Sequence, residues 1–172
     1  MAFTPDNHSL ALAIIRQYPD SRSAIMPLAH LAQDQEGWLT PEAIGEIAAL
    51  LDLERAEIFG VVSFYTMYKL EPLGRLIVSV STCPTAMIAG AYEVLHALEE
   101  RFRDDPDVHV EEVECGAACD RCPYMQVNYE FHEDVTPESA IAIVEEYKSG
   151  ARVARGVSGG EPTGTEIAGG RI

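Results

Sequence analysis

Cysteine is the residue type in this chain whose spacing most directly indicates chemistry. Cys115, Cys119 and Cys122 lie within one short segment, and Cys83 lies far upstream. In a reducing compartment, clustered cysteines indicate a metal site or redox chemistry rather than structural disulfides. The small residues between Cys115 and Cys119 would let both sulfurs approach one iron, and iron–sulfur clusters are usually held by four cysteine thiolates.

Other chemistry is open to the same cysteines. Four thiolates also suit a zinc ion, and a disulfide is a further alternative. Cys119 and Cys122 form a C-x-x-C motif, which thioredoxin-like oxidoreductases place at a helix N-terminus, where the thiol pKa is lowered. Here the motif lies between two expected strands with several acidic residues nearby. We therefore expect raised thiol pKa values, which disfavour dithiol exchange.

The net charge of the chain indicates which classes of partner it can bind. Among 172 residues, 12 are Lys or Arg and 28 are Asp or Glu, for a net charge of −16. Nucleic acids and anionic lipid surfaces are poor partners, because binding them requires basic side chains. An acidic surface suits docking onto a basic face of another protein. No apolar run approaches the ~20 residues of a membrane span, and residues 1–9 lack the pattern of a secretory signal. We expect a cytoplasmic protein without membrane insertion.

The first half of the chain has helical periodicity. Thr40, Pro41 and Glu42 combine a hydroxyl N-cap, a proline at the first helical position and an acid in the first turn. The apolar spacing predicts three further helices, which are expected to start near Ser9, to cover 23–35 and to cover 52–65. Residues 1–73 are therefore predicted to form a helical bundle.

The pattern changes to short strands from Arg75 onward. Strands are predicted over 75–80, 108–113, 124–129 and 131–135, with helices over 90–102 and from Thr136. A strand–helix–strand connection favours a parallel pair, and the later strands favour a hairpin. The chain is thus predicted to be an α+β protein whose residues 74–150 form a thioredoxin-like domain with a small mixed sheet. Residues 151–172, rich in Gly, Ser and Thr, are expected to be a flexible tail.

Five segments, spread over roughly residues 10–150, carry a family resemblance. They are 33–39 (QDQEGWL), 63–68 (SFYTMY), 90–95 (GAYEVL), 113–128 (VECGAACDRCPYMQVN) and 133–138 (EDVTPE). They resemble the small [2Fe-2S] subunit of bacterial NADH:quinone oxidoreductase (complex I), a thioredoxin-like ferredoxin. The same module occurs in NAD-dependent formate dehydrogenases and NAD-linked hydrogenases.

The resemblance implies a helical N-terminal region, a thioredoxin-like C-terminal domain and a [2Fe-2S] cluster. It also implies a partner subunit that binds FMN and NADH, other subunits of a peripheral arm, and a place at the cytoplasmic face of the membrane. The chain would then carry electrons in the respiratory chain as part of an enzyme complex, with no catalytic site of its own.

The resemblance also implies where the cluster ligands should be, and the chain departs from that pattern. The family's ligands come as C-x4-C and then C-x3-C. The second pair matches Cys115 and Cys119, but the first falls on Ser81 and Ala86. Either Cys83 and Cys122 replace the missing pair, or the chain is a cluster-less structural subunit of the same complex. We predict the ligand set Cys83, Cys115, Cys119 and Cys122, and keep the second alternative open.

Overall fold

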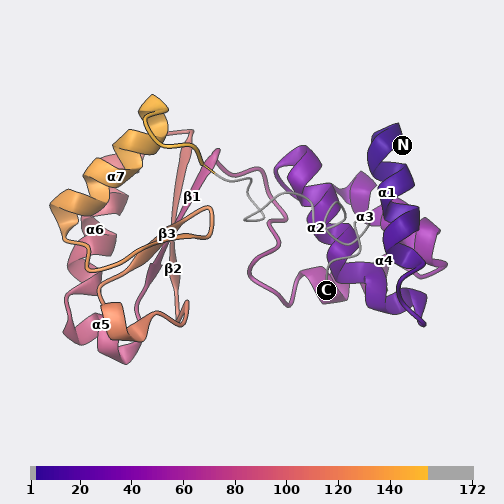
Figure 1. Cartoon of the computed structure of the whole chain (residues 1–172), viewed down its shortest axis with the longest axis horizontal. Coiled ribbons are helices and arrows are strands. Elements are labelled where there is room, and N and C mark those ends of the chain that lie inside the picture. Colours follow the sequence, from indigo (N-terminus) through magenta and orange to yellow (C-terminus); the bar gives the residue numbers. More distant parts are fainter. Residues whose placement is uncertain (1–2, 155–172) are drawn as a thin grey trace. The chain divides into compact units, whose positions relative to one another are not determined.

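The described part of the chain, residues 3–154 of a computed structural model, forms two compact units (Figure 1). The division between them falls between Pro72 and Leu73. Most of the segment expected to be a flexible tail lies outside the described residues. None of the described helices combines the length and apolarity that crossing a membrane requires.

The first unit is helical, as predicted. It contains α1 (Pro5–Ile15), the 3-10 turn η1 (Ser21–Ala24), α2 (Ile25–Glu36), α3 (Pro41–Leu51) and α4 (Arg55–Val62). Its core is built from apolar side chains of all four α-helices, among them Ile14, Leu28, Leu31, Ile47 and Ile58, which are almost fully buried.

Two helix starts in this unit differ from the prediction. Helix α1 begins at Pro5 rather than near Ser9, because the Thr4 side chain accepts a hydrogen bond from the backbone N–H of Asn7 and caps the helix. Helix α4 begins after Glu54 rather than at Asp52. Asp52 has a left-handed backbone conformation that ends α3.

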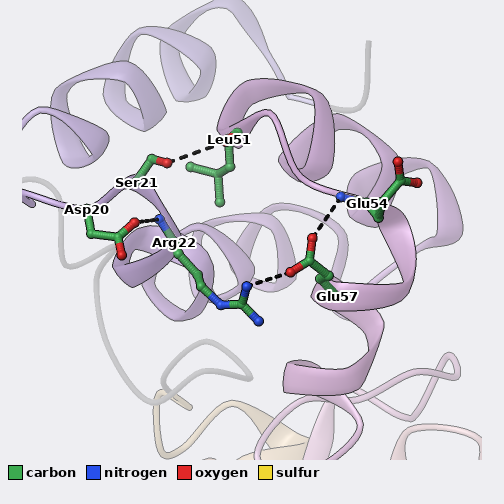
Figure 2. A network of polar contacts seen from close by, with 6 residues as sticks. All are labelled: Asp20, Ser21, Arg22, Leu51, Glu54 and Glu57. Carbon is green, nitrogen blue, oxygen red and sulfur yellow. Dashed lines mark hydrogen bonds and ion pairs between the residues drawn. The ribbon is translucent and has the colours of Figure 1, made fainter.

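Polar contacts connect η1 to the ends of α3 and α4 (Figure 2). The Arg22 guanidinium lies 2.5 Å from the Glu57 carboxylate, which also accepts a hydrogen bond from the backbone N–H of Glu54 at 3.3 Å. The Ser21 hydroxyl donates to the carbonyl oxygen of Leu51 at 3.4 Å. Because the Arg22 and Glu57 side chains remain accessible to solvent, at 57% and 33% exposure, their ion pair contributes little to the stability of the unit.

The second unit contains a four-stranded mixed sheet in the order β2-β1-β3-β4. The strands are β1 (Leu76–Ser81), β2 (Val108–Val113), β3 (Met125–Val127) and β4 (Glu130–His132). Strand β1 pairs with β2 in parallel and with β3 in antiparallel orientation, and β3 and β4 form a hairpin. The predicted α+β class, the parallel pair and the hairpin are confirmed.

Helices complete this unit. Helix α6 (Ala91–Phe102) and helix α7 (Pro137–Ser149) pack side by side against the sheet (Figure 1). Their apolar faces and the strands form one core, which includes Val78, Val80, Leu98, Met125 and Val144. Helix α5 (Pro84–Ile88) was not predicted, because five residues are too few to show an apolar period.

Asn128 connects the β3–β4 hairpin to the beginning of β1. Its side-chain oxygen accepts from the backbone N–H of Ile77 at 2.8 Å, and its side-chain nitrogen donates to the carbonyl oxygen of Arg75 at 3.1 Å. The residue is buried and has a positive φ of 47°. Asparagine tolerates that conformation better than most residues do.

We expect Asn128→Ala to lower the free energy of unfolding by about 1–3 kcal/mol, because the N–H of Ile77 loses its buried acceptor. Urea unfolding and amide exchange at Ile77 measure the effect. Asn128→Gly relieves any strain of the positive φ but also removes the acceptor. A glycine variant as stable as the wild type would show that backbone strain, not hydrogen bonding, governs this position.

His132 is a buried titratable residue of the second unit. Its ring Nε2 lies 3.1 Å from the hydroxyl oxygen of Tyr147, and burial lowers the pKa of the imidazole below its ordinary value, with the nearby Arg152 acting in the same direction. As the pH falls below about 6.5, the unfolded chain therefore binds a proton before the folded chain does.

We expect the melting temperature to fall as the pH drops from 7.5 to 5, and His132→Gln to reduce that fall. Thermal unfolding at several pH values measures both. His96→Gln, which changes an exposed histidine on α6, is the matched control. Equal pH dependence in the two variants would contradict this role of His132.

Candidate metal centre

Strand pairing brings the ends of β1 and β2 to the same edge of the sheet. Ser81 and Val113, the last residues of these strands, are partners in the parallel register. Cys83 and Cys115 each lie two residues beyond that pair. Because parallel strands end at the same edge, the loops that follow them lie side by side.

Strand β3 begins at this edge too, because it is antiparallel to β1. Met125, its first residue, pairs with Val80 near the end of β1. The residues that precede it, from Cys119 to Tyr124, are therefore held at the same edge as Cys83. The peptide bond between Cys122 and Pro123 is cis.

Three of the four predicted ligands converge there. The Sγ atoms of Cys83 and Cys119 are 3.6 Å apart, and those of Cys115 and Cys119 are 3.3 Å apart. All three sulfurs lie within 4.8 Å of one another. Cys83 is buried, Cys119 is half-buried and Cys115 is exposed, so the group is reached from solvent on the Cys115 side.

The fourth cysteine lies beside this group without being part of it. The Cys122 thiol donates to the carbonyl oxygen of Cys119 at 3.3 Å. Its side chain packs, with that of Cys119, against a small cluster made of Cys83, Ala86 and Ala91.

The two positions where the family pattern expects cysteines are part of the interior. Ser81 and Ala86 have no exposed surface. The Ser81 hydroxyl donates to the carbonyl oxygen of Glu114 at 3.5 Å, and Ala86 packs against Cys83. Alanine has no donor atom for a metal, so Ala86 cannot replace the cysteine that the family pattern has at this position.

Backbone N–H groups favour the thiolate form at the two outer sulfurs. A hydrogen bond from the backbone of Ala86, in the first turn of α5, lowers the pKa of Cys83. The N–H of Ala117 lies 3.3 Å from the Cys115 sulfur and lowers the pKa of that thiol. These hydrogen bonds thus favour the deprotonated form of both thiols.

The two thiols of the C-x-x-C motif, Cys119 and Cys122, have raised pKa values instead. Hydrogen bonds to the thiols of Cys115 and Cys83 raise the pKa of Cys119 to about 12. Burial, followed by the charge of Cys83, raises the pKa of Cys122. The expected direction is confirmed, but the main causes are neighbouring thiols and burial rather than acidic side chains. Raised pKa values disfavour nucleophilic dithiol exchange by this pair.

Tyr124 is a site residue that sequence reasoning missed. Its side chain is buried, and its hydroxyl oxygen accepts from the N–H of Gly116 at 2.6 Å while lying 3.9 Å from the Cys115 sulfur. A Cβ at Gly116 would lie 3.2 Å from the tyrosine ring, so glycine permits this close approach. A tyrosine next to the Cys-Pro pair, at the start of an apolar strand, was the available signal.

Comparison with known proteins gives the same family as the sequence resemblance. Residues 11–148 match the thioredoxin-like [2Fe-2S] ferredoxin family. A Mycobacterium tuberculosis protein, named as a subunit of NADH-quinone oxidoreductase, is 39% identical over 146 residues, 81% of this chain and 58% of that protein. The chain thus spans little more than half the length of this relative. A Rickettsia bellii protein, named as the same subunit, is 34% identical over 158 residues, 86% of this chain and 95% of that protein.

A solved structure shares the fold. The structure of an NAD+-reducing [NiFe]-hydrogenase in the H2-reduced state aligns with 72% of this chain and 22% of its own, with a TM-score of 0.62 and 21% identity. At that level of identity the likeness shows the fold alone. Together these similarities confirm the family resemblance and the thioredoxin-like fold predicted from the sequence.

We expect Tyr124→Phe to raise the pKa of Cys115, because the tyrosine hydroxyl is one of the groups that lower it. The measurement is the rate of Cys115 alkylation by iodoacetamide in the metal-free chain between pH 6 and pH 10, followed by mass spectrometry. The rate profile should move to higher pH. Tyr92→Phe, which removes a hydroxyl bonded to Glu112, is the control. An unchanged profile in Tyr124→Phe would contradict the contact.

Proposed function

The chain belongs to the thioredoxin-like [2Fe-2S] ferredoxin family, and from that premise we propose that it is an electron-transfer subunit of an NADH:quinone oxidoreductase. Relatives named as a subunit of that enzyme align with most of the chain, which supports the assignment. The single observation that carries the proposal is the convergence of cysteine thiols from two loops at one edge of the sheet.

The ligands in this proposal are Cys83, Cys115, Cys119 and Cys122. Four thiolates are the usual donor set of a [2Fe-2S] cluster, so the chain fits in donor type and number. In this assignment Cys115 and Cys119, whose sulfurs are 3.3 Å apart, would bind one iron, and Cys83 and Cys122, which pack in the same small cluster, would bind the other. A bound cluster supplies one-electron oxidation and reduction.

The surroundings of the thiols support this role. The backbone of Ala86 and Ala117 and the hydroxyl of Tyr124 stabilise negative charge on sulfur. Such hydrogen bonds are among the factors that set cluster potentials. The protein part of the site thus binds, orients and adjusts the charge of the redox group, whose chemistry is its own.

The partner in this proposal is the subunit that binds FMN and NADH. On α5, the helix that begins directly after Cys83, Ile88 is 87% exposed and Met87 is 50% exposed. Exposed apolar side chains on the helix that follows Cys83 suit a surface that another protein covers. The net charge of −16 suits a basic partner face. Other subunits of a peripheral arm, at the cytoplasmic face of the membrane, complete the proposed setting.

Two alternatives remain within the same family. The absence of cysteine at the two family ligand positions, Ser81 and Ala86, fits a cluster-less structural subunit that keeps the partner interface. The fold shared with an NAD+-reducing hydrogenase fits an equivalent subunit of a hydrogenase or an NAD-dependent formate dehydrogenase.

Anaerobic purification of the intact complex tests the proposal. We expect about two iron and two acid-labile sulfide atoms per copy of this chain beyond those of the other subunits, as a [2Fe-2S] cluster requires. The difference should appear against the same complex carrying Cys119→Ser, which removes a ligand. Visible absorption and the EPR spectrum after reduction should change with it.

Ser81→Ala is the informative control, because Ser81 occupies a family ligand position but is not a ligand in our assignment. We expect its iron content to equal that of the wild type. Loss of iron in Ser81→Ala would overturn the ligand set. Equal iron content in the wild-type and Cys119→Ser complexes, with assembly intact, would support the cluster-less alternative instead.

A further inference from the structure

The distances between the three converged sulfurs suit ligands of one metal ion better than ligands shared between two. A tetrahedral zinc site has Zn–S bonds of about 2.3 Å, which places its sulfurs about 3.8 Å apart. The Cys83–Cys119 and Cys115–Cys119 sulfur distances are 3.6 Å and 3.3 Å, close to the sulfur–sulfur distance of such a site. The remaining pair also lies within 4.8 Å. A single ion could therefore bind three thiolates with small side-chain movements.

A two-iron cluster requires a different spacing. It divides four thiolates into two pairs, one on each iron, and the inorganic core separates the pairs. With Cys115 and Cys119 on one iron, Cys83 belongs to the other. Its sulfur is nevertheless as close to Cys119 as two ligands of one ion are. Cluster binding would have to separate the sulfurs of Cys83 and Cys119, whereas a single ion would not.

A fourth ligand for one ion is available from Cys122. Its side chain is half-buried and packs in the cluster that contains Cys83. The thiol is now hydrogen-bonded to a backbone carbonyl, that of Cys119. Rotation of the side chain would exchange this weak hydrogen bond for a metal–sulfur bond. The four-cysteine set is a standard donor set for structural zinc.

The charge around the sulfurs also favours a cation. Arg121, the nearest basic residue along the chain, forms ion pairs with Glu133 and Asp134. Hydrogen bonds from backbone N–H groups, at Ala117 and in the first turn of α5, favour negative charge on the sulfurs of Cys115 and Cys83. A divalent ion would compensate most of the remaining negative charge.

We propose that the chain, before it takes up a cluster, binds one Zn2+ ion through Cys83, Cys115 and Cys119, with Cys122 as the fourth ligand. This inference rests on the ligand set of the proposed function. Zn2+ displaces the thiol protons to solvent and undergoes no redox change. Zinc is thus a competing occupant of the same thiols, and a zinc-loaded chain carries no electrons through this site.

The test uses the full, metal-free chain under anaerobic, reducing conditions, titrated with Co2+ and then with Zn2+. We expect one Co2+ per chain, with the absorption of tetrahedral thiolate coordination, and its displacement by one equivalent of Zn2+. Binding should weaken as the pH falls from 8 to 6, because protons compete for the thiolates. An octahedral cobalt spectrum, or more than one ion needed for saturation, would overturn the proposal.

Variants identify the ligands. Cys83→Ser should weaken zinc binding about tenfold or more, and Cys122→Ser should lower the thiolate-to-cobalt absorption by about one quarter, from four sulfurs to three. Ser79→Ala is the control, since its hydroxyl bonds to Glu111 rather than to a thiol. X-ray absorption of the zinc-loaded wild type requires no variant to fold: four sulfurs at about 2.3 Å are expected, and a mixed sulfur–oxygen shell would overturn the proposal.

Cluster reconstitution with iron and sulfide, with and without one equivalent of Zn2+, separates this inference from the proposed function. We expect zinc to block the visible absorption of the cluster. A cluster that forms while zinc stays bound would overturn the competition and leave the proposed function standing. Tetrahedral cobalt binding without any cluster formation would support the zinc site and count against the proposed function.

Discussion

The pairing of β1 with β2 and β3 is the constraint on which the site depends. Parallel pairing sends the loops after β1 and β2 to one edge of the sheet, and antiparallel pairing makes β3 start from that edge. Cysteines that are far apart along the chain therefore meet because the strands carry them there. The apolar core between the sheet and helices α6 and α7 stabilises this pairing, so the site inherits its geometry from the fold.

Close approach of thiols has an electrostatic consequence. Neighbouring thiolates repel one another, and hydrogen bonds to Cys115 and Cys83 raise the pKa of Cys119, which favours its protonated form. The outer sulfurs of Cys83 and Cys115 instead receive backbone hydrogen bonds that favour the anion. A metal ion removes this conflict, because it replaces the thiol proton with a larger positive charge. The same arrangement that disfavours dithiol exchange is therefore consistent with the metal binding that we propose.

Local signals predicted much of the fold, and their failures have local causes. Thr40 and Thr136 were recognisable because their hydroxyls, followed by proline, cap α3 and α7. The predicted start of α1 was wrong. Thr4 and Pro5 have the same cap signature, but the apolar period of this terminal segment is weak and placed the start near Ser9. Helix α5 is too short to have a period. Tyr124 falls at the start of a predicted strand, and only its tertiary contacts reveal the hydroxyl beside the Cys115 sulfur.

The sequence alone determined the family, the α+β order of elements and the chemical type of the site, because these depend on residue identity and spacing along the chain. Which sulfurs meet was decided by the tertiary structure. Cys83, Cys115 and Cys119 converge, Cys122 lies beside them, and Ser81 and Ala86 are enclosed in the interior. The physical reason is that sulfur–sulfur distances follow from strand register and loop packing. Both arise from contacts between distant segments, which no local pattern encodes.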